Sequence, residues 1–346
     1  MAFQYLTNIP LTKAKKEYLE LLKAKGMTPR TEKIKVFDAV GRITAGPVYA
    51  NISAPHYNAC AMDGIALNAK LTFGATETTP VFLTPEQYVP VDTGDPLPRG
   101  CDAVVMIEDV VATEGGIRLY QAATPWQHIR QIGEDICAGE MLLPSYSEIT
   151  PSSVGAMIAA GVLEVEVIKK PVVGIIPTGD EIIQPTTNPK EGDIIEFNSS
   201  IFSSMLKGWG AETITFPIVE DNLERIKTAI SDALDKCDVV ILNAGSSAGR
   251  EDFSAQAISE VGEVLYHGLA IKPGKPAILG YSGAKAILGV PGYPVSGIIV
   301  IEEILRPIIE YLANRPAEEK KYEEAVLSKA IVSSLKYQEF VRVRLG

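Results

Sequence analysis

The sequence predicts an α/β protein built from more than one domain. Its 346 residues are too many for one ordinary hydrophobic core, so two to three domains are expected. From residue 171 to residue 315, apolar strands alternate with amphipathic helices, which is typical of a doubly wound, largely parallel sheet. Residues 50–135 instead carry short apolar runs broken by Pro, Gly and Thr, which predict a separate β-rich domain.

Composition narrows the class of partner. Hydrophobic residues make up 46% of the chain and charged residues 22%, which is typical of a globular protein. The formal net charge of −11, with no stripe of Lys and Arg between aromatic residues, argues against a nucleic-acid partner. A small anionic ligand stays open, because local positive charge can override an acidic average.

The cysteines and the longest apolar run exclude three further classes. The four cysteines are far apart, with no CxxC motif and no His at ligand spacing, which excludes a local zinc module and a disulfide framework. With no signal peptide, this favours a reducing cytoplasm. The apolar run Gly297 to Ile301 is ended by Glu302, so we expect no membrane span. These cysteines are Cys60, Cys101, Cys137 and Cys237.

The N-terminal half is expected to be interrupted by the β-rich domain. Residues Leu11 to Lys25 carry apolar side chains at helical spacing, and Ser152 to Ala160 resembles a short helix. We expect this second helix to return the chain to the neighbourhood of the first. Residues 1–49 and 136–170 are therefore predicted to form one discontinuous helical domain around the β-rich insertion.

The α/β domain is read from its alternating segments. The last long helix is expected from Val295, and Asp221 has the spacing of a capping box with Glu224. Beyond residue 315 the chain turns charged and then strand-like, so residues 316–346 are expected to begin a further β domain. The other predicted elements are strands at Val172–Ile176, Thr213–Phe216, Val239–Leu242 and Val264–His267, and helices from Asn198 to Gly210 and after Asp221.

The loop after the strand Val239–Leu242 is the most informative stretch. Its small residues Gly245, Ser246 and Ser247 let backbone N–H groups approach an anion, and Arg250 adds a charge that grips phosphate oxygens. A helix expected from Phe253 points its positive end into the same space. The alternative is a tight turn without a ligand.

Two further loops should meet this one, because ligands of such sheets bind beyond the carboxyl ends of the strands. After the first strand come Thr178, Gly179, Asp180 and Glu181; adjacent carboxylates suit Mg²⁺ completed by substrate phosphates, with Asp252 as a further candidate. The alternative is that Asp180 and Glu181 only cap the next turn.

Lys272 and Lys275 lie on a loop stiffened by Pro and Gly and form a second, cationic group; ordinary solvated lysines are the alternative. Pro291 and Pro294 make a rigid entry to the last helix. No dinucleotide fingerprint, P-loop or histidine triad is present, so a metal-assisted phosphate site is favoured over hydride transfer.

Three turns of the β-rich domain combine tight geometry with reactive side chains. Asp63 precedes Gly64, Thr93 lies in Asp92–Pro98, and Arg130 and Asp135 bound a third turn. Surface turns of this kind usually do no more than turn, so they need a partner surface to form a site.

Taken together, eight segments resemble molybdopterin molybdenumtransferases, the family of MoeA and the gephyrin E domain. The resemblance runs in order over nearly the whole chain. The segments are Ala61–Gly64, Thr93–Pro98, Gly100–Val105, Arg130–Asp135, Pro177–Glu181, Gly245–Gly249, Ile271–Pro276 and Pro291–Pro294.

The resemblance implies a cytoplasmic homodimer of four-part subunits whose last part is a β-barrel, of which this chain holds only the start. It implies a site between the α/β domain of one subunit and the β-rich domain of the other. The implied reaction takes adenylylated molybdopterin and molybdate, releases AMP with Mg²⁺, and leaves molybdenum on the dithiolene. The adenylyltransferase of the same pathway is an expected partner.

The resemblance also assigns residues by position. Asp63, Thr93, Glu181 and Asp252 are expected to be catalytic, and Asp180, Glu181 and Asp252 to hold the metal. Cofactor binding is expected from Arg130, Asp135, Thr178, Gly179, Asp221, Gly245, Ser246, Ser247, Arg250, Lys272, Lys275, Pro291 and Pro294.

Three positions depart from the family pattern. Tyr293 replaces the usual Asn between the last two prolines, Phe253 replaces a Tyr that often follows the acidic residue, and Gly268 replaces a basic residue. These departures change the cationic complement. Two alternatives stay open: a non-catalytic molybdopterin- or anion-binding scaffold, as the gephyrin relation suggests, and a homologue that inserts tungstate, an oxyanion of the same charge and nearly the same size as molybdate.

Overall fold

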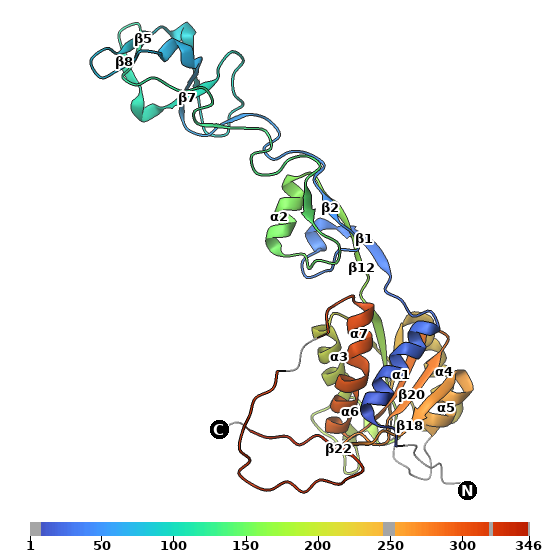
Figure 1. The fold of residues 1–346 in the computed structure, drawn as a ribbon. Coiled ribbons are helices and arrows are strands. Elements are labelled where there is room, and N and C mark those ends of the chain that lie inside the picture. Colours follow the sequence, from blue (N-terminus) through green and yellow to red (C-terminus); the bar gives the residue numbers. More distant parts are fainter. Residues whose placement is uncertain (1–7, 245–252, 318–320, 345–346) are drawn as a thin grey trace, which may run out of the picture. The chain divides into compact units, whose positions relative to one another are not determined.

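The computed structural model describes residues 8–244, 253–317 and 321–344 (Figure 1). The chain divides into two compact units. The α/β unit consists of residues up to Glu32 and from Ile168 onward, and the β-rich unit of Lys33–Val167. Among the described residues, no helix combines the length and the apolar character needed to cross a membrane.

The α/β unit is built on a six-stranded sheet in the order β16-β13-β17-β21-β20-β18. The first four strands pair in parallel, whereas β20 is antiparallel to both β21 and β18. This confirms the predicted α/β fold, with a hairpin between β20 and β21 as its antiparallel part. The strands are β13 (Val172–Pro177), β16 (Glu212–Thr215), β17 (Val239–Ala244), β18 (Glu263–His267), β20 (Ile278–Ser282) and β21 (Lys285–Pro291).

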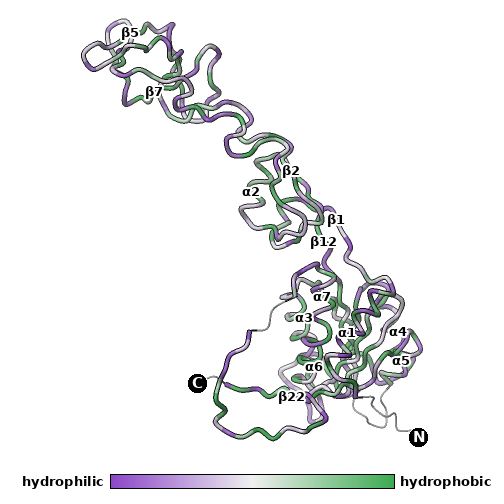
Figure 2. Tube along the Cα trace, in the orientation of Figure 1, coloured by the Kyte–Doolittle hydropathy of each residue, from purple (hydrophilic) through white to green (hydrophobic). Residues whose placement is uncertain are grey.

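Helices cover both faces of this sheet because its central strands are apolar on both sides. In β17, Val239 and Ile241 join the core under α1, α3, α6 and α7, whereas Val240 and Leu242 join the core under α4 and α5 (Figure 1). Figure 2 shows the corresponding hydrophobic runs. The helices are α1 (Leu11–Ala24), α3 (Asn198–Gly208), α4 (Leu223–Lys236), α5 (Phe253–Val261), α6 (Pro294–Val300), the π-helical turn η5 (Ile301–Leu305) and α7 (Arg306–Leu312).

The first helix lies in a place that its amphipathic pattern did not reveal. The buried face of α1 packs into the core of the α/β unit, whereas α2 (Pro151–Ala159) packs in the β-rich unit against η1 (Val36–Asp38) and β11 (Met141–Leu143). The two helices thus belong to different compact units. An apolar stripe shows that a helix is buried, but not against which partner.

Tyr18 ties α1 to the sheet. Its hydroxyl is completely buried and donates to the carbonyl oxygens of Gly280 and Ile287, on neighbouring strands. We expect Tyr18→Phe to lower the free energy of unfolding by about 1–3 kcal/mol, because two buried carbonyls lose a donor. Urea denaturation checks this, with Tyr322→Phe, at a residue 88% exposed, as the control that should show no change.

The β-rich unit contains two three-stranded antiparallel sheets, β6-β4-β7 and β5-β9-β8, which share an apolar core. Its short strands agree with the pattern of residues 50–135. The bounds are β4 (Gly64–Leu67), β5 (Val81–Leu83), β6 (Tyr88–Val91), β7 (Ala103–Met106), β8 (Val111–Thr113), β9 (Gly116–Leu119), and the pairs β1 (Thr31–Lys35) with β12 (Glu164–Ile168), β2 (Val48–Tyr49) with β11, and β3 (Ala59–Cys60) with β10 (Ile129–Arg130); the remaining 3₁₀ turns are η2 (Ala69–Thr72), η3 (Pro85–Gln87) and η4 (Ile107–Asp109).

The close approach of two strands explains why the predicted turn contains a glycine at position 64. A Cβ atom at this position would lie 2.0 Å from the carbonyl oxygen of Val105 on the neighbouring strand β7. Only glycine lets the two backbones approach this closely. The glycine thus positions the carboxylate of Asp63 at the start of β4.

The C-terminal segment, residues 321–344, has little regular structure. Its strand β22 (Gln338–Glu339) pairs in parallel with β19 (Ile271–Lys272), part of the lysine loop, which we define as residues 268–277. All four cysteines are free, as the sequence predicts.

Candidate functional site

The topology brings the predicted loops of the α/β unit to one edge of the sheet. Strands β16, β13, β17 and β21 are parallel, and β18 runs in the same direction as β21 because both are antiparallel to β20. The residues after each strand therefore lie at the carboxyl edge. They include Thr178–Glu181, Asp221, the lysine loop and Pro291–Pro294.

A cavity of about 280 Å³ opens at this edge, at the ends of β13 and β17. We name it the asparagine cavity after two of its residues. One wall is apolar and includes Phe197 and the short pair β14 (Ile182–Ile183) and β15 (Ile194–Ile195). The complete lining is Pro177, Thr178, Glu181, Ile182, Ile194, Ile195, Glu196, Phe197, Asn198, Asn243, Gly292, Tyr293 and Pro294.

The asparagine cavity contains buried polar atoms without a partner among the described residues. Thr178 Oγ1, Asn198 Oδ1 and Asn243 Oδ1 belong to residues only 3%, 8% and 6% exposed. Ser199 Oγ, one residue further along α3, is a fourth such atom. Buried polar groups are nearly always paired, so this cluster indicates a ligand or water that completes it.

The orientation of Asn198 defines what the cavity offers. Its side-chain nitrogen donates to the carbonyl of Gly292 at 2.8 Å, so its oxygen is the free acceptor. Glu181 and Glu196 add carboxylates to the lining. Acceptors between apolar walls suit a flat heterocycle with N–H donors and repel a phosphate.

The turn after β13 is fixed by its backbone. Gly179 has a φ of 143°, and its N–H donates to the carbonyl of Val219 at 3.1 Å. Asp180 Oδ1 accepts from the backbone N–H of Asp221 at 3.0 Å, which joins this loop to the one after β16. The predicted helix cap at Asp221 is wrong: the N-cap of α4 is Asn222, whose side chain accepts from Arg225 N.

The carboxylates at this edge of the sheet suit a Mg²⁺ ion that binds together with the substrate. Within the described ranges, no three His, Cys, Asp or Glu side chains gather as a metal site. Asp180 and Glu181 are adjacent and exposed. Mg²⁺ commonly binds through one or two carboxylates and completes its shell with water and substrate phosphates, so this pair fits a metal that enters with the substrate.

Five predicted site residues lie outside the described residues: Gly245, Ser246, Ser247, Arg250 and Asp252. The structure describes the strand before them to Ala244 and the helix after them from Phe253. Both flanking elements were predicted within about two residues.

The lysine loop lies further along the same edge. Between β17 and β18 lie β21 and β20, so the separation is three strand spacings, on the order of 14 Å. Lys272 is exposed and Lys275 half-buried. A ligand with a heterocycle at one end and anionic groups at the other can span this distance.

The predicted residues of the β-rich unit form two local pairs. Asp63 Oδ1 accepts from the backbone N–H of Thr93 at 2.7 Å and from its hydroxyl at 2.8 Å. Arg130 binds Asp135 through Nη2 and Glu134 through Nε, the latter at 3.4 Å. These turns are thus ordered before any ligand binds.

The two hydrogen bonds from Thr93, first that of its backbone N–H and then that of its hydroxyl, hold the pKa of Asp63 below its usual range. We expect Thr93→Val to raise this pKa toward the ordinary value, because one donor is lost. An NMR titration of the Asp63 carboxyl checks this. The depressed pKa contributes stability that is complete at neutral pH and is lost as the pH falls through the folded-state pKa; an identical titration curve in the variant would contradict the assignment.

Sequence patterns did not predict the most informative residues, Asn198 and Asn243. One begins a helix and the other ends a strand, both ordinary places for Asn, and only the fold shows that their oxygens lack partners. The small strands that form the apolar wall were also missed, because two-residue runs carry no detectable period.

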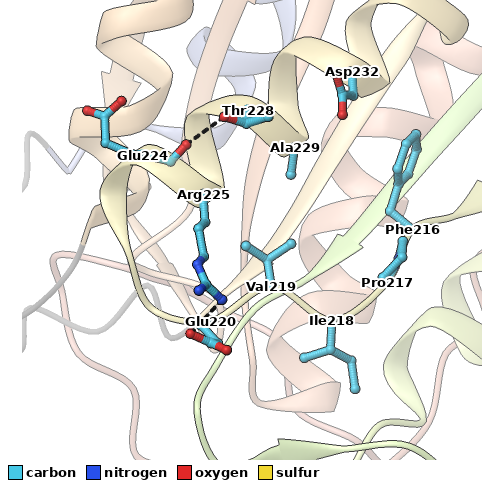
Figure 3. A pocket seen from close by; sticks show the side chains of 10 residues that line it. All are labelled: Phe216, Pro217, Ile218, Val219, Glu220, Glu224, Arg225, Thr228, Ala229 and Asp232. Atoms are coloured by element: carbon cyan, nitrogen blue, oxygen red, sulfur yellow. Dashed lines mark hydrogen bonds and ion pairs between the residues drawn. The ribbon is translucent and has the colours of Figure 1, made fainter.

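A larger cavity of about 470 Å³ lies beside α4, but it is the weaker candidate for a ligand site. Figure 3 shows two interactions among its polar groups: Arg225 binds Glu220 at 2.7 Å, and the Thr228 hydroxyl donates to the Glu224 carbonyl at 2.9 Å. We name it the α4 cavity. Although it is larger, it offers neither unpaired buried polar atoms from the described residues nor the predicted loops.

Two family models match the chain, one in each half. Residues 9–161 match the MoeA N-terminal region (domain I and II), and residues 174–311 match a probable molybdopterin binding domain. The chain is 30% identical over 332 residues to a putative molybdopterin biosynthesis protein of Methanocaldococcus jannaschii, covering 91% of this chain and 81% of that one.

Two further relatives extend the comparison. The molybdopterin molybdenumtransferase of Haemophilus influenzae is 30% identical over 316 residues, 88% of this chain and 78% of that one. The crystal structure of a molybdopterin biosynthesis MoeA protein from Pyrococcus horikoshii superposes with a TM-score of 0.74 at 31% identity, covering 89% of this chain and 81% of that chain. The chain thus belongs to the molybdopterin molybdenumtransferase (MoeA) family, as the eight sequence segments predicted.

Proposed function

We propose that this chain inserts molybdate into adenylylated molybdopterin and releases AMP. The observation that carries the proposal is the asparagine cavity, where three buried residues have polar atoms with no partner among the described residues and lie beside apolar walls. A pterin ring is flat and presents amino and ring N–H donors, which the oxygens of Asn198 and Asn243 can accept. Membership in the family supplies the substrate class.

The anionic parts of the substrate need a different place, because Glu181 and Glu196 make the asparagine cavity acidic. We assign the phosphate groups and molybdate to the lysine loop, with Lys272 and Lys275 at the same sheet edge. Gly245, Ser246, Ser247 and Arg250, outside the described residues, are proposed to complete this region. Positive side chains would stabilise the charge that builds up during phosphoanhydride cleavage.

Asp180 and Glu181 are proposed to hold Mg²⁺ together with Asp252. When bound, Mg²⁺ neutralises phosphate charge and orients the leaving nucleotide. Asp180 is already fixed by the Asp221 backbone, which leaves its second oxygen free of that bond. Thr178, Gly179, Pro291 and Pro294 would shape the turns around the substrate.

A direct assay tests the function. Purified full-length chain is incubated with adenylylated molybdopterin, with and without molybdate and Mg²⁺, and AMP is quantified. The proposal expects AMP release that requires both ions. Substrate binding without AMP release would support the runner-up, a non-catalytic scaffold.

The choice of oxyanion is tested by metal analysis. Molybdate and tungstate have the same charge and nearly the same size, so the site described here accommodates both. After turnover with each oxyanion, the molybdenum or tungsten retained on the dithiolene is measured. A product with tungsten alone would favour the tungstate-inserting alternative.

We further propose that the active form is a homodimer whose site combines residues of both subunits. The β-rich unit holds Asp63 and Thr93 in a fixed pair, and Arg130 and Asp135 in another. We expect these residues to act on substrate bound by the α/β unit of the other subunit. The cytoplasmic adenylyltransferase of the same pathway is the expected supplier of substrate.

Subunit mixing tests this arrangement. Asp63→Ala and Glu181→Ala are each expected to lose nearly all activity, but mixed dimers would contain one intact site. Equal mixing after dissociation and reassociation should therefore restore roughly a quarter of the wild-type rate. No recovery in a mixture shown to contain heterodimers would contradict a shared site.

A further inference from the structure

The aromatic ring of Tyr337 lies against the amino groups of both lysines of the lysine loop. Lys272 Nζ is 4.6 Å from the centre of the ring, and Lys275 Nζ is 5.5 Å from it. We propose that Tyr337 is a positioning residue that holds the two ammonium groups together for an oxyanion. This inference rests on the proposed function, in which these lysines bind the anionic part of the substrate.

The backbone of the C-terminal segment fixes the ring in this place. Two backbone hydrogen bonds follow Tyr337 in the sequence. Gln338 N donates to the Ala270 carbonyl at 2.8 Å, and Phe340 N donates to the Lys272 carbonyl at 2.8 Å. The side chain of Phe340 also packs against the core of the α/β unit. Strand β22 is thus anchored to the same loop whose lysines contact the ring.

Hydrogen bonds through Ser334 and Glu339 also orient the side chain of Lys272. Its ammonium donates to Ser334 Oγ at 3.3 Å, and both the N–H and the hydroxyl of Ser334 contact Glu339 Oε1 at 3.1 Å. The pKa of Glu339 is held below its usual range, first by the hydrogen bonds from Ser334 and also by the positive charge of Lys272. Ser334 therefore lies between the carboxylate and the ammonium.

The physical advantage of a ring is that it attracts cations without cancelling their charge. An ammonium over a π face is held by the quadrupole of the ring, and two cations can share one ring. In the described part of the chain, neither lysine forms an ion pair within 4.0 Å. Neither charge is therefore neutralised by a direct ion pair with a described residue, and the conformational entropy lost on binding an anion is reduced.

Leucine and phenylalanine variants separate the ring from its hydroxyl. In full-length chain whose lysines carry ¹³C-dimethyl groups, the ring current of Tyr337 should shift the Lys272 and Lys275 methyl signals, assigned through Lys→Arg variants. Tyr337→Leu should abolish this shift and weaken molybdate binding, measured by calorimetry, by about three- to tenfold. Tyr337→Phe should retain the shift and bind molybdate within about twofold of wild type.

Tyr322→Leu is the matched control, since Tyr322 lies in the same segment and is 88% exposed. It should change neither the signals nor the affinity. Wild-type methyl signals without a ring-current shift, or equal molybdate affinity in Tyr337→Leu and wild type, would overturn the inference. Loss of affinity in Tyr337→Phe as large as in Tyr337→Leu would also overturn it, because the ring would not be the cause.

The experiments distinguish a failure of this inference from a failure of the proposed reaction. If the signals and the molybdate affinity respond as expected but no AMP is released, the positioning role stands and the proposed reaction fails. If AMP is released but Tyr337→Leu binds molybdate as wild type does, the reaction stands and the positioning role fails.

Discussion

Replacing Lys272 with methionine is expected to lower kcat/KM for AMP release by about 10²–10³-fold. Methionine keeps most of the unbranched side chain and leaves the backbone hydrogen bond from Phe340 N to the residue-272 carbonyl in place. It removes the positive charge proposed to stabilise the phosphates and molybdate. The measurement is the rate of AMP release at low substrate concentration, with molybdate and Mg²⁺ in excess.

The matched control is Lys329→Met, at an exposed lysine of the C-terminal segment. It removes the same charge from the same region and should leave the rate unchanged. If both variants lose activity equally, net charge and not the lysine loop is responsible. If Lys272→Met keeps the wild-type rate, Lys272 does not belong to the site.

Replacing Glu181 with alanine is expected to lower the rate of AMP release by about 10²-fold and to raise the Mg²⁺ concentration needed for half-maximal rate by about 10- to 100-fold. Glu181 lines the asparagine cavity next to Asp180, where a carboxylate can bind a metal that enters with the substrate. Initial rates measured over a Mg²⁺ titration separate the two effects.

Glu191→Ala is the control for this variant, because Glu191 is an exposed carboxylate ten residues further along the chain. It should behave as wild type. An unchanged AMP-release rate in correctly folded Glu181→Ala would remove Glu181 from the site.

The sequence was sufficient for those parts of the fold that follow from local periodicity. The runs around Val240 and the helical spacing of Ile226 and Ile230 predicted β17 and α4, because a buried strand and an amphipathic helix each leave a pattern in their own residues. The parallel direction of the strands then follows from the alternation of strands and helices along the chain. Because the strands are parallel, the loops that follow them were expected at the same edge of the sheet.

Features that depend on contacts between distant residues could not be predicted in this way. The position of α1 rests on Tyr18, whose hydroxyl reaches carbonyls more than 260 residues away. Capping at Asn222 in place of Asp221 depends on a one-residue difference in where the turn closes. Neither choice changes the local pattern of apolar residues.

The residues of the candidate site likewise divide into those that the sequence singles out and those that only the folded structure shows. Glu181 and Pro294, which line the asparagine cavity, stand in loops that the sequence singles out, whereas Asn198 and Asn243 were missed. What distinguishes these two is the absence of a partner for a buried oxygen among the described residues, and this is a property of the folded structure alone. Tyr337 was missed because its ring meets the lysines across a gap of more than 60 residues.

The affinity for adenylylated molybdopterin, measured by calorimetry in variants of the two cavities, tests the location of the site most directly. We predict that Asn198→Leu and Asn243→Leu each bind at least tenfold more weakly, since each removes an acceptor from the asparagine cavity. Asp232→Asn, in the α4 cavity, should bind as wild type does. Wild-type affinity in both asparagine variants, with weaker binding in Asp232→Asn, would contradict the account.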